Sequence, residues 1–138
     1  MGVLGVSFNV HEVEASGTIY IKADGSVEGT TNIVSADNVT YTFTADITDT
    51  IVVQRSNITI DGNGHTLQGP GGEGFYLAGI SNVTIRNTNI KGFDVGIYII
   101  FGSHHNTISR NNITTNGIAG IWIDLFSNCN TISRNNIT

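Results

Sequence analysis

The stretch Asn106-Thr-Ile-Ser-Arg-Asn-Asn-Ile-Thr114 decides the fold of this 138-residue chain, because it recurs unchanged as Asn130-Thr-Ile-Ser-Arg-Asn-Asn-Ile-Thr138. The two copies begin 24 residues apart, and their alternation of isoleucine with polar residues is typical of short β-strands. Repetition at a fixed period of this length is the sequence signature of a solenoid, in which each unit stacks on the next.

Weaker copies of the same unit extend toward the N-terminus. Four apolar-x-apolar segments open successive units: Ile51-Val-Val53, Phe75-Tyr-Leu77, Ile97-Tyr-Ile99 and Ile121-Trp-Ile123. We expect a second strand around Ile60, Ile85, Ile108 and Ile132, and a third around Leu67, Ile90, Ile113 and Ile137. Three short strands per unit predict a triangular coil, whose backbone groups bond to the coils above and below, about 4.8 Å away.

Alternation at the opening strands points their apolar residues into the core, namely Ile51, Val53, Phe75, Leu77, Ile97, Ile99, Ile121 and Ile123. In the second strand, an inward position changes along the repeat from Ile58 and Val83 to Asn106 and Asn130. Buried amides need partners, and stacked asparagines can hydrogen-bond to one another along the solenoid axis. We therefore interpret Asn106 and Asn130 as structural residues.

Composition excludes several classes of protein. No stretch has the 3.6-residue periodicity of a helical repeat, and four leucines are too few for a leucine-rich repeat. The net charge of −5 gives no electrostatic footprint for nucleic acid, which is not expected as a partner. The single cysteine, Cys129, excludes an internal disulfide, and no apolar run is long enough to predict a membrane span.

The stretch Asn57-Ile-Thr-Ile-Asp-Gly-Asn-Gly-His-Thr-Leu67, followed by Gly-Ile-x-Ile and Asn-Thr-Ile-Ser-x-Asn-Asn-Ile units, resembles the parallel β-helix repeat proteins. These include pectin-lyase-like enzymes, NosD-like periplasmic proteins and archaeal surface proteins. The resemblance covers roughly residues 50 to 138 and implies an all-β, right-handed, single-stranded parallel β-helix with an N-terminal β cap. We expect about four to five coils. Function does not follow from this fold, since it carries lyases, hydrolases, adhesins and structural modules.

Three regions are expected along the chain. Residues 51–138 form the repeats, and residues 17–50 form N-terminal strands that cap the first coil, with alternating segments at 18–22 and 39–47. Residues 1–16 resemble the end of a signal peptide, which predicts a secreted or cell-surface protein. If this segment remains in the mature protein, Leu4, Val6, Phe8 and Val10 alternate as in a half-buried strand.

The polar residues predict neither catalysis nor a cofactor or metal. The acids of the repeat region are scattered over different turns, whereas glycoside hydrolysis needs a facing pair; these acids are Asp61, Glu73, Asp94 and Asp124. The sequence Asp61-Gly-Asn-Gly-His65 is interpreted as a tight turn rather than a calcium loop, because the twelfth position holds Gly72. His104-His105 is interpreted as a polar turn. Arg110 and Arg134 occupy identical positions one coil apart and could bind an anion or carboxylate, but we favour the interpretation that they keep a charged face solvated.

Tyr76, Tyr98 and Trp122 form an outward ladder in the opening strands. Stacked aromatic faces can hold sugar rings, with Asp124 and Arg110 supplying polar contacts. Aromatic residues on adjacent coils can equally stabilise one another by packing, and we favour that interpretation. The carbohydrate platform stays open as an alternative, either as a binding module or as the front of a truncated polysaccharide-active enzyme or adhesin.

The repeat is complete at Thr138, where a stacked coil would present unpaired strand edges and apolar residues such as Ile132 and Ile137. Either the sequence is part of a longer protein, or this edge meets another molecule. In the second case, residues 4–10 could add as a strand to a neighbour's edge and build a head-to-tail filament. The leading expectation is thus a non-catalytic structural protein that self-associates, with a polysaccharide as an alternative partner.

Overall fold

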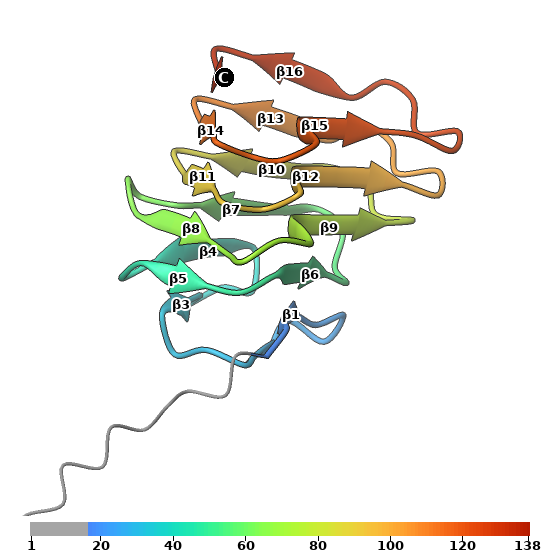
Figure 1. The fold of residues 1–138 in the computed structure, drawn as a ribbon. Helices are drawn as coiled ribbons and strands as arrows, with labels where there is room; N and C mark the ends of the chain where they lie inside the picture. The colour runs from blue at the N-terminus through green and yellow to red at the C-terminus, as the bar shows by residue number, and fades with distance from the viewer. Residues whose placement is uncertain (1–16) are drawn as a thin grey trace, which may run out of the picture.

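The computed structural model describes residues 17–138, which form seventeen strands and no helix (Figure 1). Sheet A contains β1 (Ile19–Ile21), β2 (Val27–Glu28), β6 (Ile51–Val53), β9 (Glu73–Ala78), β12 (Val95–Ile100) and β15 (Ala119–Ile123). Sheet B contains β3 (Ile33–Val34), β4 (Thr40–Phe43), β7 (Ile58–Asp61), β10 (Val83–Arg86), β13 (Thr107–Ser109) and β16 (Thr131–Ser133). Sheet C contains β5 (Ile47–Thr48), β8 (Thr66–Gln68), β11 (Asn89–Lys91), β14 (Asn112–Thr114) and β17 (Asn136–Ile137).

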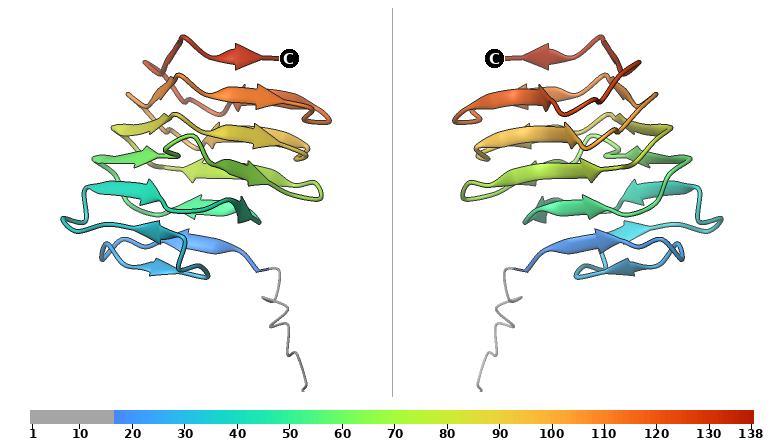
Figure 2. Two further views of the ribbon diagram at one scale, coloured as in Figure 1. Left: turned by 90° about the vertical axis from the view of Figure 1, so that its left-hand side faces the viewer. Right: turned by 90° about the vertical axis from the view of Figure 1, so that its right-hand side faces the viewer.

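Each turn of the chain contributes one strand to each sheet, and successive turns pair in parallel. The side views in Figure 2 show these turns as layers stacked one above another. The register confirms the predicted units, since Ile51 pairs with Phe75, Phe75 with Ile97, and Ile97 with Ile121. The predicted parallel β-helix is therefore the fold of the chain. Within the described range there is no helix that could cross a membrane.

The core is a set of apolar ladders inside the triangle. Side chains at every second position of the strands are buried, and Ile60, Leu67, Phe75, Ile85, Ile90 and Ile97 are completely enclosed. The last coil is less covered: Ile121 and Ile123 pack against the core but keep part of their surface exposed. The alternation of short isoleucine-rich strands thus places one apolar face of every strand inward.

Asparagines occupy the corners of the coil that runs from β12 to β14. Asn106, Asn111 and Asn116 each accept a backbone N–H from the coil below, donated by Val83 (2.9 Å), Thr88 (3.0 Å) and Phe93 (3.2 Å) respectively. The side-chain amides of the first two donate back to the carbonyls of Ile80 and Ile85. The corners are therefore held by bonds from side chain to backbone.

The next coil repeats this pattern at two corners. The Oδ1 atoms of Asn130 and Asn135 accept the N–H groups of Asn106 and Asn111, both at 2.9 Å. The predicted ladder of Asn106 and Asn130 is confirmed, but its main bonds join amide side chains to backbone rather than to each other. The second ladder, Asn111 and Asn135, was not anticipated, although both residues lie in the repeated segment.

Residues 17–50 form the first coil of the solenoid and also two short strands that cover the outer edge of this coil. Strands β1, β4 and β5 pair in parallel with β6, β7 and β8, whereas β2 and β3 fold back as antiparallel strands on β1 and β4. The buried Tyr41 hydroxyl donates to the carbonyl of Gly25 (2.8 Å) and ties the β1–β2 turn to β4. The alternating segment predicted over 39–47 is divided between two strands, because the chain turns a corner after β4 to pass from sheet B to sheet C.

We predict that Asn106→Ala lowers the free energy of unfolding by about 2 kcal/mol, since it leaves the buried N–H of Val83 and the part-buried C=O of Ile80 without their partner. The control is Asn112→Ala, an exposed asparagine whose Oδ1 accepts only from Asn136. It should change stability by less than about 0.5 kcal/mol. Urea unfolding measures both variants, and an equal loss would contradict the structural role of the ladder.

Candidate functional site

The outer face of sheet A carries a ladder of aromatic rings, one from each of three adjacent strands. Tyr76 in β9 pairs with Tyr98 in β12, and Tyr98 pairs with Trp122 in β15. Their ring centroids lie 5.8 Å apart in both steps, with interplanar angles of 62° and 54°. The first pair is edge-to-face, which is a favourable packing arrangement for aromatic rings, and the second pair is tilted. A flat, coplanar platform is therefore not formed.

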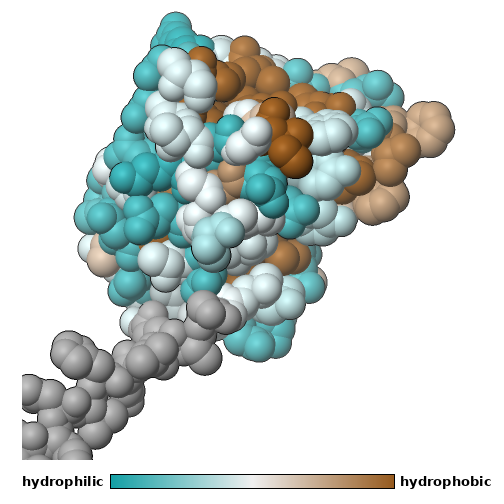
Figure 3. All heavy atoms as spheres, in the orientation of Figure 1, coloured by the Kyte–Doolittle hydropathy of each residue, from teal (hydrophilic) through white to brown (hydrophobic). Residues whose placement is uncertain are grey.

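Apolar side chains extend this face at its C-terminal end. Figure 3 shows them over the upper part of the face and at its right-hand edge, beside the turns after β12 and β15. Trp122 is 40% exposed and Phe126 is 86% exposed, with Phe101 and Leu125 also exposed beside Phe126. The turn residues Phe101, Leu125 and Phe126 all have positive φ, which is unusual for bulky side chains. Sequence reasoning missed this patch, because a strand period gives no information about turns.

Asp124 lies at the end of β15, one position beyond the inward Ile123. Its Oδ1 atom accepts the N–H of Leu125 at 2.7 Å, so the carboxylate caps its own turn. Arg110, which with Asp124 could have supplied polar contacts beside the aromatic ladder, instead lines a groove on sheet B with Thr107 and Ser109. The structure brings the three aromatic residues together and separates them from Arg110.

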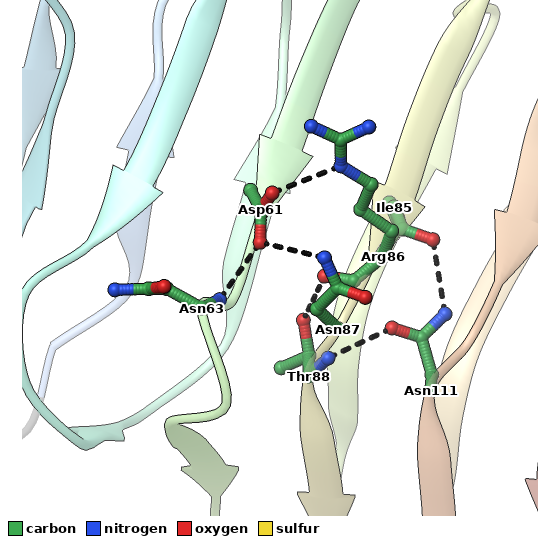
Figure 4. A network of polar contacts seen from close by, with 7 residues as sticks. All are labelled: Asp61, Asn63, Ile85, Arg86, Asn87, Thr88 and Asn111. Atoms are coloured by element: carbon green, nitrogen blue, oxygen red, sulfur yellow. Dashed lines mark hydrogen bonds and ion pairs between the residues drawn. The ribbon is translucent and has the colours of Figure 1, made fainter.

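Asp61 is the best-connected acid of the repeat region (Figure 4). Its carboxylate accepts the N–H of Asn63 at 2.9 Å, the amide of Asn87 at 3.1 Å and the Nε–H of Arg86 at 2.9 Å. Burial raises the pKa of Asp61, but these hydrogen bonds and the charge of Arg86 outweigh it and hold the pKa below its ordinary value. The acid closes its own turn and binds the coil above.

Two other acids have similar structural contacts. Asp46 accepts the N–H of Thr66 at 2.8 Å and lies 3.5 Å from His65, while Asp94 accepts the N–H of Gly72 at 2.8 Å. These bonds each join neighbouring coils. His104 is likewise structural, because its Nδ1 accepts the N–H of Asn128 at 3.0 Å. In residues 17–138, no group of three or more His, Cys, Asp or Glu side chains is arranged to hold a metal ion.

The proposed assembly residues fall in two places. Ile132 in β16 and Ile137 in β17 lie on the outermost coil and are 45% and 46% exposed. Leu4, Val6, Phe8 and Val10 lie outside the described residues. The exposed edge of the last described coil therefore offers apolar surface together with strand backbone.

We predict that Asp61→Asn destabilises the protein by about 1 to 2 kcal/mol at pH 7, because it weakens three hydrogen bonds to a carboxylate. Since folding lowers the pKa of Asp61, its contribution is full above about pH 5 and is lost as the pH falls below about 4, through the folded-state pKa. The difference between wild type and variant should shrink over that range in urea titrations. Glu28→Gln, at an exposed ion pair, serves as the control and should leave the pH profile nearly unchanged.

Of the comparisons with known proteins, the one with family models agrees with this architecture. Neither the curated proteins nor the solved structures gave a match. A family model described as "Right handed beta helix region" matches residues 17–138, which is the whole of the described solenoid. With its stacked parallel coils, three sheets and inward isoleucine ladders, the chain belongs to the right-handed β-helix family.

Proposed function

We propose that this chain is a non-catalytic structural β-solenoid, secreted or displayed at a cell surface, which associates head to tail through the edge of its last described coil. The observation that carries this proposal is that its aspartates make structural hydrogen bonds. Asp46, Asp61 and Asp94 are each bonded to a neighbouring coil, and Asp124 caps a turn. These aspartates therefore stabilise the contacts between coils and the turns of the solenoid.

The direction of the asparagine ladders supports an association at that edge. Every ladder asparagine reaches down to the coil before it, so a coil placed on β16 and β17 would meet the N–H groups of Asn130 and Asn135 in the same way. Such a coil would also cover Ile132 and Ile137. A following segment or a second molecule can supply this contact, and we propose a second molecule.

The opposite end of the solenoid has a different chemistry. Strands β2 and β3 are antiparallel there and cover two of the three sheets, whereas sheet C ends at β5. Head-to-tail contact would therefore join unlike surfaces. Because the coils of such a contact would stack along one axis, the arrangement would not close into a ring and would produce an open filament. Residues 4–10 are the proposed strand donor to the neighbour's edge.

We predict that Ile132→Lys combined with Ile137→Lys abolishes self-association, because lysines on an exposed edge strand oppose pairing with another chain. Val52→Lys is the matched control, since Val52 is also an outward-facing strand residue but lies in β6, which pairs with strands on both sides and is away from both ends of the solenoid. Sedimentation velocity and negative-stain microscopy should give concentration-dependent assemblies for the wild type and the control alone. A chain lacking residues 1–12 should also be monomeric, and a monomeric wild type would disprove the assembly.

A carbohydrate-binding module is the second candidate function, favoured by the exposure of Trp122 beside the apolar turn residues. In this case the ladder of Tyr76, Tyr98 and Trp122 would contact sugar rings. The edge-to-face angle between Tyr76 and Tyr98 and the tilt between Tyr98 and Trp122 favour packing instead. Removal of the Trp122 indole distinguishes the structural function from the carbohydrate-binding function.

We predict that Trp122→Ala lowers the free energy of unfolding by about 1 kcal/mol, because it removes the packing of the indole against Tyr98. Glycan binding should be the same for the variant and the wild type. Differential scanning calorimetry and a glycan array measure the two effects. Val52→Ala, at the outward position of the same face in β6, provides a control without an aromatic ring. Glycan binding by the wild type that disappears only in Trp122→Ala would establish the carbohydrate function.

A further inference from the structure

A shallow groove of about 320 Å³ lies on the outer face of sheet B, away from the aromatic face. Three arginines line it from successive coils: Arg86, Arg110 and Arg134. Hydroxyl side chains complete its wall: Thr84, Thr107, Ser109 and Ser133. The strand register explains this arrangement, because Arg86 pairs with Ser109 and Ser109 with Ser133. We call this surface the arginine groove.

The charge of the arginine groove is positive in a chain that is negative overall. None of its lining residues is acidic, and within residues 17–138 neither Arg110 nor Arg134 forms an ion pair. Arg86 is held through its Nε–H by Asp61 at 2.9 Å, and Figure 4 shows its two terminal nitrogens turned away from that carboxylate. Arg86 is thus oriented by Asp61 through its Nε–H, and no hydrogen bond within residues 17–138 engages its terminal N–H groups.

The backbone at Arg110 and Arg134 is left-handed, with φ of 58° and 57°. The equivalent position one coil below Arg110 holds Asn87, with φ of 54°. Asparagine tolerates this conformation well, whereas a long side chain there costs free energy. Two consecutive coils therefore place arginine where asparagine fits the backbone better.

We propose that the arginine groove binds an anionic polysaccharide through its sulfate or carboxylate groups. The planar guanidinium group pairs with such oxyanions through two parallel hydrogen bonds, and the threonine and serine hydroxyls can donate to the same groups or to sugar oxygens. Arg110 and Arg134 are separated along the axis by one coil, about 4.8 Å. The groove runs over three coils, so it fits a linear polymer with repeated anionic groups rather than a single ion.

Nucleic acid fits this surface less well. Binding of single strands relies on aromatic side chains that stack on the bases, and no aromatic residue lines the groove. A polysaccharide needs only the local oxyanion contacts.

The test uses the variant Arg110→Asn combined with Arg134→Asn in the full chain. Asparagine suits the left-handed backbone, so the variant should fold with stability equal to or above that of the wild type. Lys91→Asn is the control, because Lys91 is an exposed cation on sheet C. The probes are dextran sulfate, polygalacturonate, uncharged dextran, inorganic sulfate and a single-stranded DNA, each measured by isothermal titration calorimetry at low salt.

The wild type should bind dextran sulfate or polygalacturonate but not dextran, and the double variant should weaken this binding at least about tenfold, as expected for the loss of two exposed ion pairs. Lys91→Asn should change the Kd less than about twofold. Three results would overturn the proposal: no binding of either anionic polymer, equal weakening by Lys91→Asn, or preferential binding of DNA. Saturation by inorganic sulfate at the same concentration as the polymer would overturn the polymer specificity.

Discussion

Short strands joined by tight corners leave every backbone group dependent on a neighbouring coil. A three-residue strand such as β6 forms no ladder inside its own turn, so its N–H and C=O groups bond to β1 below and β9 above. This requirement fixes the register, and the register fixes which side chains stack. The inward isoleucines, the corner asparagines, the outward aromatic rings and the arginine groove all follow from the same alignment of coils.

The sequence predicts those parts of the fold that depend on the strand period. Ile97 and Ile121 could be aligned from the repeat alone, because a one-residue slip would turn isoleucine out of the core. The corners are less predictable, since their geometry depends on side-chain bonds across coils. Asn111 lies in the repeated segment, yet the hydrogen bond from its side-chain amide to the carbonyl of Ile85 becomes evident only when the coils are stacked. The division of residues 39–47 between two sheets was missed for the same reason.

The surface sites show the same division. Tyr76, Tyr98 and Trp122 could be placed together because they lie on strands, whereas their ring angles depend on side-chain packing. Phe101, Leu125 and Phe126 lie in turns of unequal sequence, where no period operates. The contact of Asp61 with Arg86 needs the register between β7 and β10, and the two residues are 25 positions apart in the chain.

Each corner asparagine bonds to the coil that precedes it in the sequence, and this direction implies an order in which the coils become stable during synthesis. During synthesis, Val83 and Thr88 are made before Asn106 and Asn111. Their backbone N–H groups therefore have no side-chain acceptor until the next coil has been synthesised. Each new coil therefore locks the one before it and remains loose until its successor arrives. Loosening should proceed in the reverse order, and amide hydrogen exchange should slow from the most recently added coil toward the older ones.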